Sequence, residues 1–130
     1  MSHIIQGIDI APLLKARATF ERFCQHLNTD QEKAGAVQAF EFCYELAWKT
    51  MKRFLDKQGI EVRSPRDAFR EAALNRLIED PKPWFVFIEK RNITTHAYDE
   101  KILEEIVHIF KDFSKELSAF VRVLENDLHE

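Results

Sequence analysis

Residues 29–59 read TDQEKAGAVQAFEFCYELAWKTMKRFLDKQG, a stretch without proline in which apolar side chains recur every three or four positions. This period predicts one helix that reaches about residue 58. Thr29 and Glu32 have the spacing of a capping box at its start, and Gly59 is placed to end it. The apolar stripe consists of Val37, Phe40, Tyr44, Trp48, Met51 and Leu55. Such a stripe requires other helices to cover it.

The sequences on either side contain two further apolar stripes of the same kind. One runs through residues 9–27, and the other through residues 99–124, where apolar side chains keep a near-heptad rhythm. No segment shows the alternation of apolar and polar residues that is typical of a strand, and no internal repeat is visible. We therefore expect three long helices and no sheet.

Two short helices are expected between the long central helix and the last one. Ser64, followed by proline, provides a cap and a first turn for a helix over residues 65–78. Asp80, again followed by proline, begins a second helix that reaches about Arg91. The sequence thus predicts an all-α, four-helix-type up-and-down bundle of three long and two short helices, in a single domain over residues 1–130.

Composition limits the class of protein. Of the 130 residues, 45% are hydrophobic and 32% charged, as in soluble globular proteins. No apolar run approaches the roughly 18 to 20 residues that span a bilayer, and no signal peptide is visible, so we expect a cytoplasmic protein without a membrane partner. The net charge of −3 argues against a protein that coats nucleic acid by charge alone.

The charge is unevenly distributed along the chain. Residues 49–91 carry 11 basic and seven acidic side chains, a local net charge of +4. Such a region is either a set of solvated helix faces or a surface that faces phosphate, and the sequence leaves both interpretations open.

The side chains best suited to catalysis or ligand binding lie together in the segment RNITTHAY, residues 91–98. Arg91 offers a planar fork of donors that matches phosphate oxygens, and His96 can take and give a proton near neutral pH. The pair suits cleavage of an RNA phosphodiester, with His96 as the base and Arg91 stabilising the phosphoryl charge. This chemistry requires neither a metal nor a cofactor.

A purely structural role for the same segment is the alternative. Arg91 would then pair with Glu41 or Glu45, which otherwise are polar groups beside the apolar stripe of the long helix. Asn92 with Thr94 or Thr95 would cap the helix break. His96 would simply pack against its neighbours.

Three blocks of the sequence resemble one known family. They are the run from Phe40 to Lys49, the helix start from Ser64 to Asp67, and the segment from Arg91 to Glu100. The last block contains the R-x4-H-x-Y signature of the HEPN superfamily, and together the three resemble the HepT-like proteins and the related nucleotidyltransferase substrate-binding proteins. The similarity covers roughly residues 8–124.

The resemblance implies a helical homodimer that works in a two-gene module with a small nucleotidyltransferase. In one interpretation the chain is a ribonuclease toxin in which Arg91 and His96 are catalytic. The partner enzyme, acting as an antitoxin, would silence it by adenylylating Tyr98, which adds bulk and negative charge where RNA must bind. The residues expected to support substrate binding are Asn92, Thr95, Glu41, Glu45 and Trp48.

A second interpretation belongs to a different class. Here the chain is a non-catalytic subunit that binds a substrate for the nucleotidyltransferase, and the same cleft serves as a binding groove. The signature residues are compatible with both interpretations.

Overall fold

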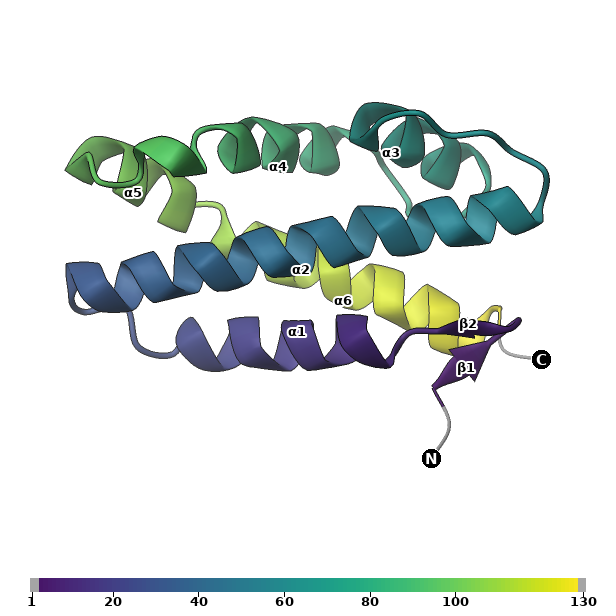
Figure 1. Cartoon of the computed structure of the whole chain (residues 1–130), viewed down its shortest axis with the longest axis horizontal. Coiled ribbons are helices and arrows are strands. Elements are labelled where there is room, and N and C mark those ends of the chain that lie inside the picture. Colours follow the sequence, from purple (N-terminus) through teal and green to yellow (C-terminus); the bar gives the residue numbers. More distant parts are fainter. Residues whose placement is uncertain (1–2, 129–130) are drawn as a thin grey trace.

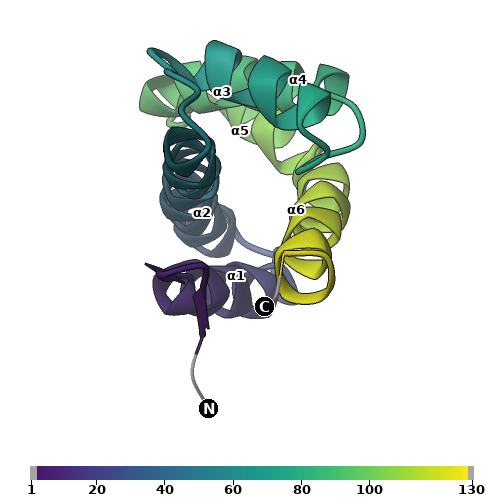
Figure 2. The ribbon, with the colours of Figure 1, turned by 90° about the vertical axis from the view of Figure 1, so that its right-hand side faces the viewer.

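The computed structural model describes residues 3–128 and confirms an all-α bundle. Its long helices are α1, α2 and α6, and its shorter ones are α3, α4 and α5 (Figure 1). Their bounds are α1 Ala11–Phe23, α2 Asp30–Lys57, α3 Pro65–Leu74, α4 Lys82–Asn92, α5 Glu100–Val107 and α6 Phe110–Asn126. Viewed end-on, α2 and α6 form two opposite sides, α1 closes a third, and α3 to α5 close the fourth (Figure 2).

The central helix α2 begins and ends as the sequence predicts. The Thr29 hydroxyl accepts a hydrogen bond from the Glu32 amide at 3.0 Å, and the Glu32 carboxylate accepts one from the Thr29 amide at 2.9 Å. This reciprocal capping box satisfies two backbone donors at the helix start. After the last turn, Gly59 has φ of +78°, a conformation that glycine adopts without steric cost.

The prediction of one uninterrupted last helix was wrong. The chain bends at His108 and Ile109, which separate α5 from α6. The break lets each helix bury its own apolar stripe: α5 packs on α2 and α4, whereas α6 packs on α1 and α4.

The expectation of no sheet was also wrong, although only slightly. Ile4–Ile5 pairs with Ile8–Asp9 as a two-stranded antiparallel hairpin. Its two turn residues, Gln6 and Gly7, have φ of +51° and +83°, as tight hairpin turns require. The strands are too short to show an alternating pattern in the sequence.

Aromatic packing fixes the helices relative to one another. The Phe113 ring of α6 lies at the centre, with ring centroids 5.3 Å from Phe20 of α1, 4.9 Å from Phe40 of α2 and 5.1 Å from Phe87 of α4, each edge-to-face. Such pairs contribute roughly 0.5–1.5 kcal/mol each beyond simple burial. They hold α4, whose C-terminal end carries the predicted site, against the rest of the bundle. Within residues 3–128, no helix is long and apolar enough to span a membrane.

Candidate functional site

Arg91 lies in the last turn of α4, opposite two carboxylates that α2 presents one turn apart. Its Nη1 is 3.5 Å from Oε2 of Glu41, and its Nε is 3.5 Å from Oε1 of Glu45. The three side chains are 31%, 34% and 36% exposed. The ion pairs that the sequence suggested as an alternative are therefore present, at the surface of the bundle.

The contact with Glu45 is loose. Nε of Arg91 is shielded from solvent and has no hydrogen-bond partner, so its approach to Glu45 is an ion pair without hydrogen-bond geometry. Glu45 also accepts a hydrogen bond from Nε1 of Trp48 at 3.0 Å and lies 3.9 Å from Nζ of Lys49. Because Glu45 divides its charge among three partners, it holds Arg91 less firmly than a dedicated two-bond pair would.

Thr94 also holds Arg91. Its hydroxyl accepts a hydrogen bond from Nη1 of Arg91 at 3.2 Å and donates one to the Arg91 carbonyl at 2.9 Å. Thr94 is buried and opens the 3₁₀ turn η1, Thr94–His96. Asn92 and Thr95 are exposed, and neither forms a side-chain hydrogen bond among residues 3–128. Of the residues expected to cap this break, Thr94 does so.

His96 and Tyr98 form a second group, on the exposed side of η1. Their ring centroids are 6.1 Å apart with an interplanar angle of 66°, and Tyr98 is 85% exposed. The amide of His96 donates to the Ile93 carbonyl, which closes the turn. Within the described chain, no hydrogen bond, ion pair or ring contact joins His96 to Arg91. A bound substrate would have to bridge the two groups.

Tyr44, which the sequence assigned to the core, also reaches this charged group of residues. It is 2% exposed, and its ring packs against Phe69 of α3 with centroids 6.1 Å apart. Burial, and next the charge of Glu45, raises the pKa of the Tyr44 hydroxyl, whereas the cations of Arg91 and Arg66 lower it. Arg66 lies one turn before Phe69 on α3, inside the Ser64 to Asp67 block that resembles the family, although the sequence assigned it no role at the site.

A shallow cavity of about 270 Å³ opens beside Arg91. It is lined by Gln38, Glu41, Phe42, Glu45 and Arg91. Its walls combine two carboxylates, one guanidinium and the ring of Phe42, which is 64% exposed. A phosphate that enters here must displace or share the carboxylate contacts of Arg91.

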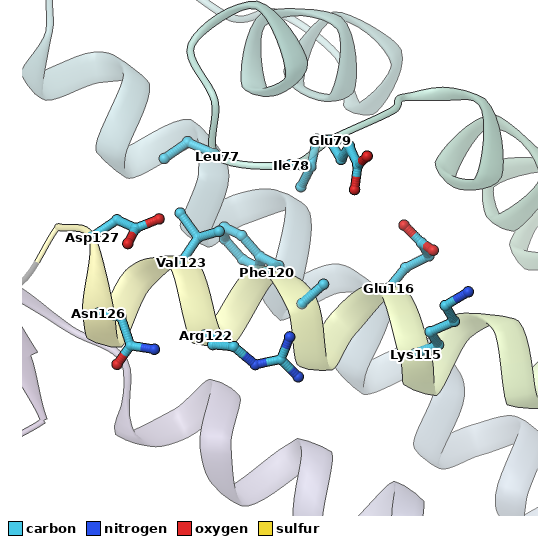
Figure 3. Close-up of a pocket in the computed structure, with 11 residues that line it drawn as sticks. Leu77, Ile78, Glu79, Lys115, Glu116, Phe120, Arg122, Val123, Asn126 and Asp127 are labelled. Atoms are coloured by element: carbon cyan, nitrogen blue, oxygen red, sulfur yellow. The ribbon is translucent and has the colours of Figure 1, made fainter.

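A larger groove, of about 580 Å³, lies between α6 and the segment that joins α3 to α4 (Figure 3). Glu79 and Glu116 face each other across it. Burial raises the pKa of Glu116, the charge of Lys115 lowers it, and the charges of Glu79, Asp80 and Asp112 raise it. None of the predicted site residues lines this groove. In residues 3–128, no three His, Cys, Asp or Glu side chains are grouped so as to hold a metal ion.

Comparison with known proteins places these features in a family context. Residues 8–126 match the family described as nucleotidyltransferase substrate binding protein like. A protein of Haemophilus influenzae named probable ribonuclease HepT is 38% identical over 96 residues, which is 70% of this chain and 66% of that protein. The match therefore spans just under two thirds of that relative.

Two solved structures have the same fold. One, from Haemophilus influenzae, is described as the substrate-binding domain of a nucleotidyltransferase; it is 31% identical, with a TM-score of 0.78 over 88% of this chain and 97% of that one. The other is a Thermus thermophilus protein that is 25% identical, with a TM-score of 0.82 over 88% of this chain and 99% of that one.

Proposed function

This chain belongs to the nucleotidyltransferase substrate-binding-like family, with HepT among its relatives, and we propose that it is a HEPN-type ribonuclease controlled by a nucleotidyltransferase partner. The observation that carries this proposal is the arrangement around η1. Arg91 lies at one end of the turn, and His96 with the exposed ring of Tyr98 lies at the other. An RNA strand laid across the turn would meet all three side chains.

The proposed reaction uses only side chains and the RNA itself. His96 removes the proton of a 2′-hydroxyl, whose oxygen attacks the adjacent phosphorus. The bond from phosphorus to the 5′-oxygen breaks, and this oxygen takes a proton from water. The products are a 2′,3′-cyclic phosphate and a 5′-hydroxyl end. Arg91 stabilises the charge on the phosphoryl oxygens, with its contacts to Glu41 and Glu45 exchanged for contacts to phosphate.

Tyr98 is proposed as the site of adenylylation by the partner. The chain has two tyrosines, and Tyr44 is 2% exposed while Tyr98 is 85% exposed. An adenylyl group on Tyr98 would place a phosphodiester and a base beside His96, where the RNA strand must lie. The modified protein would therefore be inactive.

Cleavage is tested by expressing the chain alone and examining growth and total RNA. We expect the wild type to slow growth and fragment RNA, and His96→Ala to abolish both effects. His108→Ala is the matched control, because His108 is an exposed histidine at the bend between α5 and α6, away from η1. Intact RNA with the wild type would refute the ribonuclease.

Modification is tested by coexpression with a candidate nucleotidyltransferase partner. Mass spectrometry should find one AMP moiety on the wild type and on Tyr44→Phe, and none on Tyr98→Phe. An unmodified wild type, or modification that persists in Tyr98→Phe, would remove Tyr98 from the proposal.

A second candidate function is a non-catalytic subunit that binds substrate for the nucleotidyltransferase. The observation that favours it is the hold of Glu41 and Glu45 on Arg91, which neutralises the cation that a nuclease needs. The solved Haemophilus structure described as a substrate-binding domain also supports it. This candidate predicts equal RNA integrity in the wild type and His96→Ala, together with nucleotide transfer by the partner that depends on this chain.

A further inference from the structure

Two exposed arginines of α3 share one aromatic ring of α4. The Cζ atoms of Arg66 and Arg70 lie 4.7 and 5.8 Å from the ring centroid of Phe85. Arg70 is also 3.7 Å from Asp67, whereas Arg66 has no ion pair or side-chain hydrogen bond among residues 3–128. Arg66 is thus a cation whose position is fixed by a ring and whose donors remain available to a ligand.

This arginine lies on the same edge of the bundle as the candidate site. Phe85 is on α4, two turns before Asn92 and therefore on the same face of this helix; Phe85 is half-buried and Asn92 is exposed. On the α2 side, the ring of Tyr44 packs against Phe69, one turn after Arg66 on α3, and the neighbouring Glu45 pairs with Arg91. Arg66 on α3 and Arg91 on α4 therefore lie on the two helices that adjoin this stretch of α2.

The two arginines differ in what surrounds them. Arg91 contacts two carboxylates, which suits a side chain that must release them in order to bind a reacting phosphate. Arg66 contacts none, and its fork is already oriented by Phe85. We propose that Arg66 binds a backbone phosphate of single-stranded RNA that flanks the phosphodiester held at Arg91. This inference rests on the proposed function, because it assumes that RNA is the ligand.

The salt dependence of RNA binding tests the proposal. The His96→Ala protein binds without cleaving, and its affinity for a fluorescein-labelled oligouridine of about 12 nucleotides can be followed by anisotropy between about 50 and 200 mM salt. Adding Arg66→Ala should lower the slope of log K against log salt by about 0.7, the value for one lost contact to single-stranded phosphate. Affinity near 0.1 M salt should fall about fivefold by the same relation.

Two further variants separate a phosphate contact from a structural effect. Arg66→Lys keeps the charge, so it should restore the slope. Arg22→Ala is the matched control: Arg22 is also exposed, lies 5.4 Å from the Phe23 ring, and has no ion pair within the described residues, but it belongs to α1 on the opposite side of the bundle (Figures 1 and 2). Its slope should equal that of the parent protein.

The outcomes distinguish this inference from the proposed function. RNA binding with an unchanged slope in Arg66→Ala would overturn the role of Arg66 and leave the ribonuclease proposal standing. Equal losses in Arg66→Ala and Arg22→Ala would also overturn it, because the effect would then be one of total charge. If Arg66→Ala instead weakened only capture of the nucleotidyltransferase, the surface would be a protein interface. No RNA binding by the parent protein would overturn both proposals.

Discussion

The carboxylate contacts of Arg91 are weak enough for a phosphate to replace them. Its two carboxylate contacts are both 3.5 Å long, and all three side chains are about one third exposed. Ion pairs with this much solvent contribute only about 0.2–1 kcal/mol each. A phosphate, which offers two oxygens to the guanidinium fork, can therefore compete with either one.

Because the Glu41 carboxylate would compete with an RNA phosphate for Arg91, we predict that Glu41→Gln strengthens RNA binding. The substitution removes the anion beside Nη1 of Arg91, so a phosphate no longer competes with it. In the His96→Ala background, we expect up to about fivefold tighter binding in the anisotropy assay, which corresponds to the upper end of an exposed ion pair. Glu89→Gln is the control, because Glu89 is exposed on α4 and makes no ion pair among residues 3–128. Equal gains in both variants would show that only net charge matters.

Thr94 is expected to stabilise the turn that separates Arg91 from His96. Thr94→Val keeps the side-chain shape but removes both hydrogen bonds to Arg91, so the free energy of unfolding should fall by about 1 kcal/mol. Urea unfolding measures this difference. Thr95→Val is the neighbouring control and should be nearly neutral, because Thr95 is exposed. A Thr94→Val protein as stable as the wild type would mean that the turn does not depend on this hydroxyl.

Local sequence predicted some of these contacts and missed others for a physical reason. The pairing of Arg91 with Glu41 or Glu45 was foreseeable, because carboxylates beside an apolar stripe need a partner. The approach of Arg66 to Phe85 was not foreseeable, because it depends on how α3 and α4 pack.

At the scale of elements, α5 is tied to its neighbours by two ion pairs across helices. Lys33 of α2 pairs with Glu104, and Nζ of Lys90 of α4 lies 2.6 Å from Glu105. The cation of each pair is mostly shielded, while the glutamates are about half exposed. These pairs orient the helix that follows η1, so they help to position His96 and Tyr98.

The double variant Glu104→Gln, Glu105→Gln should loosen α5 selectively. Because both interhelical ion pairs are lost, the opening equilibrium of this helix should rise severalfold. Hydrogen exchange should therefore quicken in the amides of α5. The amides of α6 serve as the internal control and should keep their wild-type rates, since α6 takes part in neither pair. Equal acceleration in both helices would mean that they open as one unit.

The bend between α5 and α6 also shows where sequence periodicity stops being informative. Capping residues and prolines act within one turn, so they located both ends of α2 and the start of α3; the end of α3 lies at Leu74, four residues before the predicted one. The bend at His108 and Ile109 has no glycine or proline, and apolar spacing continues through it. The bend accompanies a change of packing partner, because α5 packs mainly on α2 whereas α6 packs on α4 and α1.

At the scale of the whole molecule, an apolar surface adjoins the candidate site. Phe42, 64% exposed, lines the cavity beside Arg91 and also a second cavity of about 350 Å³ between α1 and α2. The second cavity is lined by Pro12, Lys15, Ala16, Thr19, Ala39 and Phe42. A large exposed aromatic in such surroundings is typical of an interaction surface. We propose that a second copy of the chain covers it, which would bring two Arg91 sites together about a twofold axis.

Phe42→Asp should therefore yield a monomer. A charge placed at the centre of a twofold interface meets its own copy, so both desolvation and repulsion oppose association. Sedimentation equilibrium measures the mass of the particle in solution. If the two sites depend on each other, the variant should also lose RNA cleavage. Leu74→Asp is the matched control, because Leu74 is 77% exposed at the end of α3 and lines neither cavity. A Phe42→Asp protein that remains a dimer would remove Phe42 from the interface. A wild type that sediments as a monomer would place the functional unit within one chain, so that Arg91 and His96 would have to act on RNA without a partner copy.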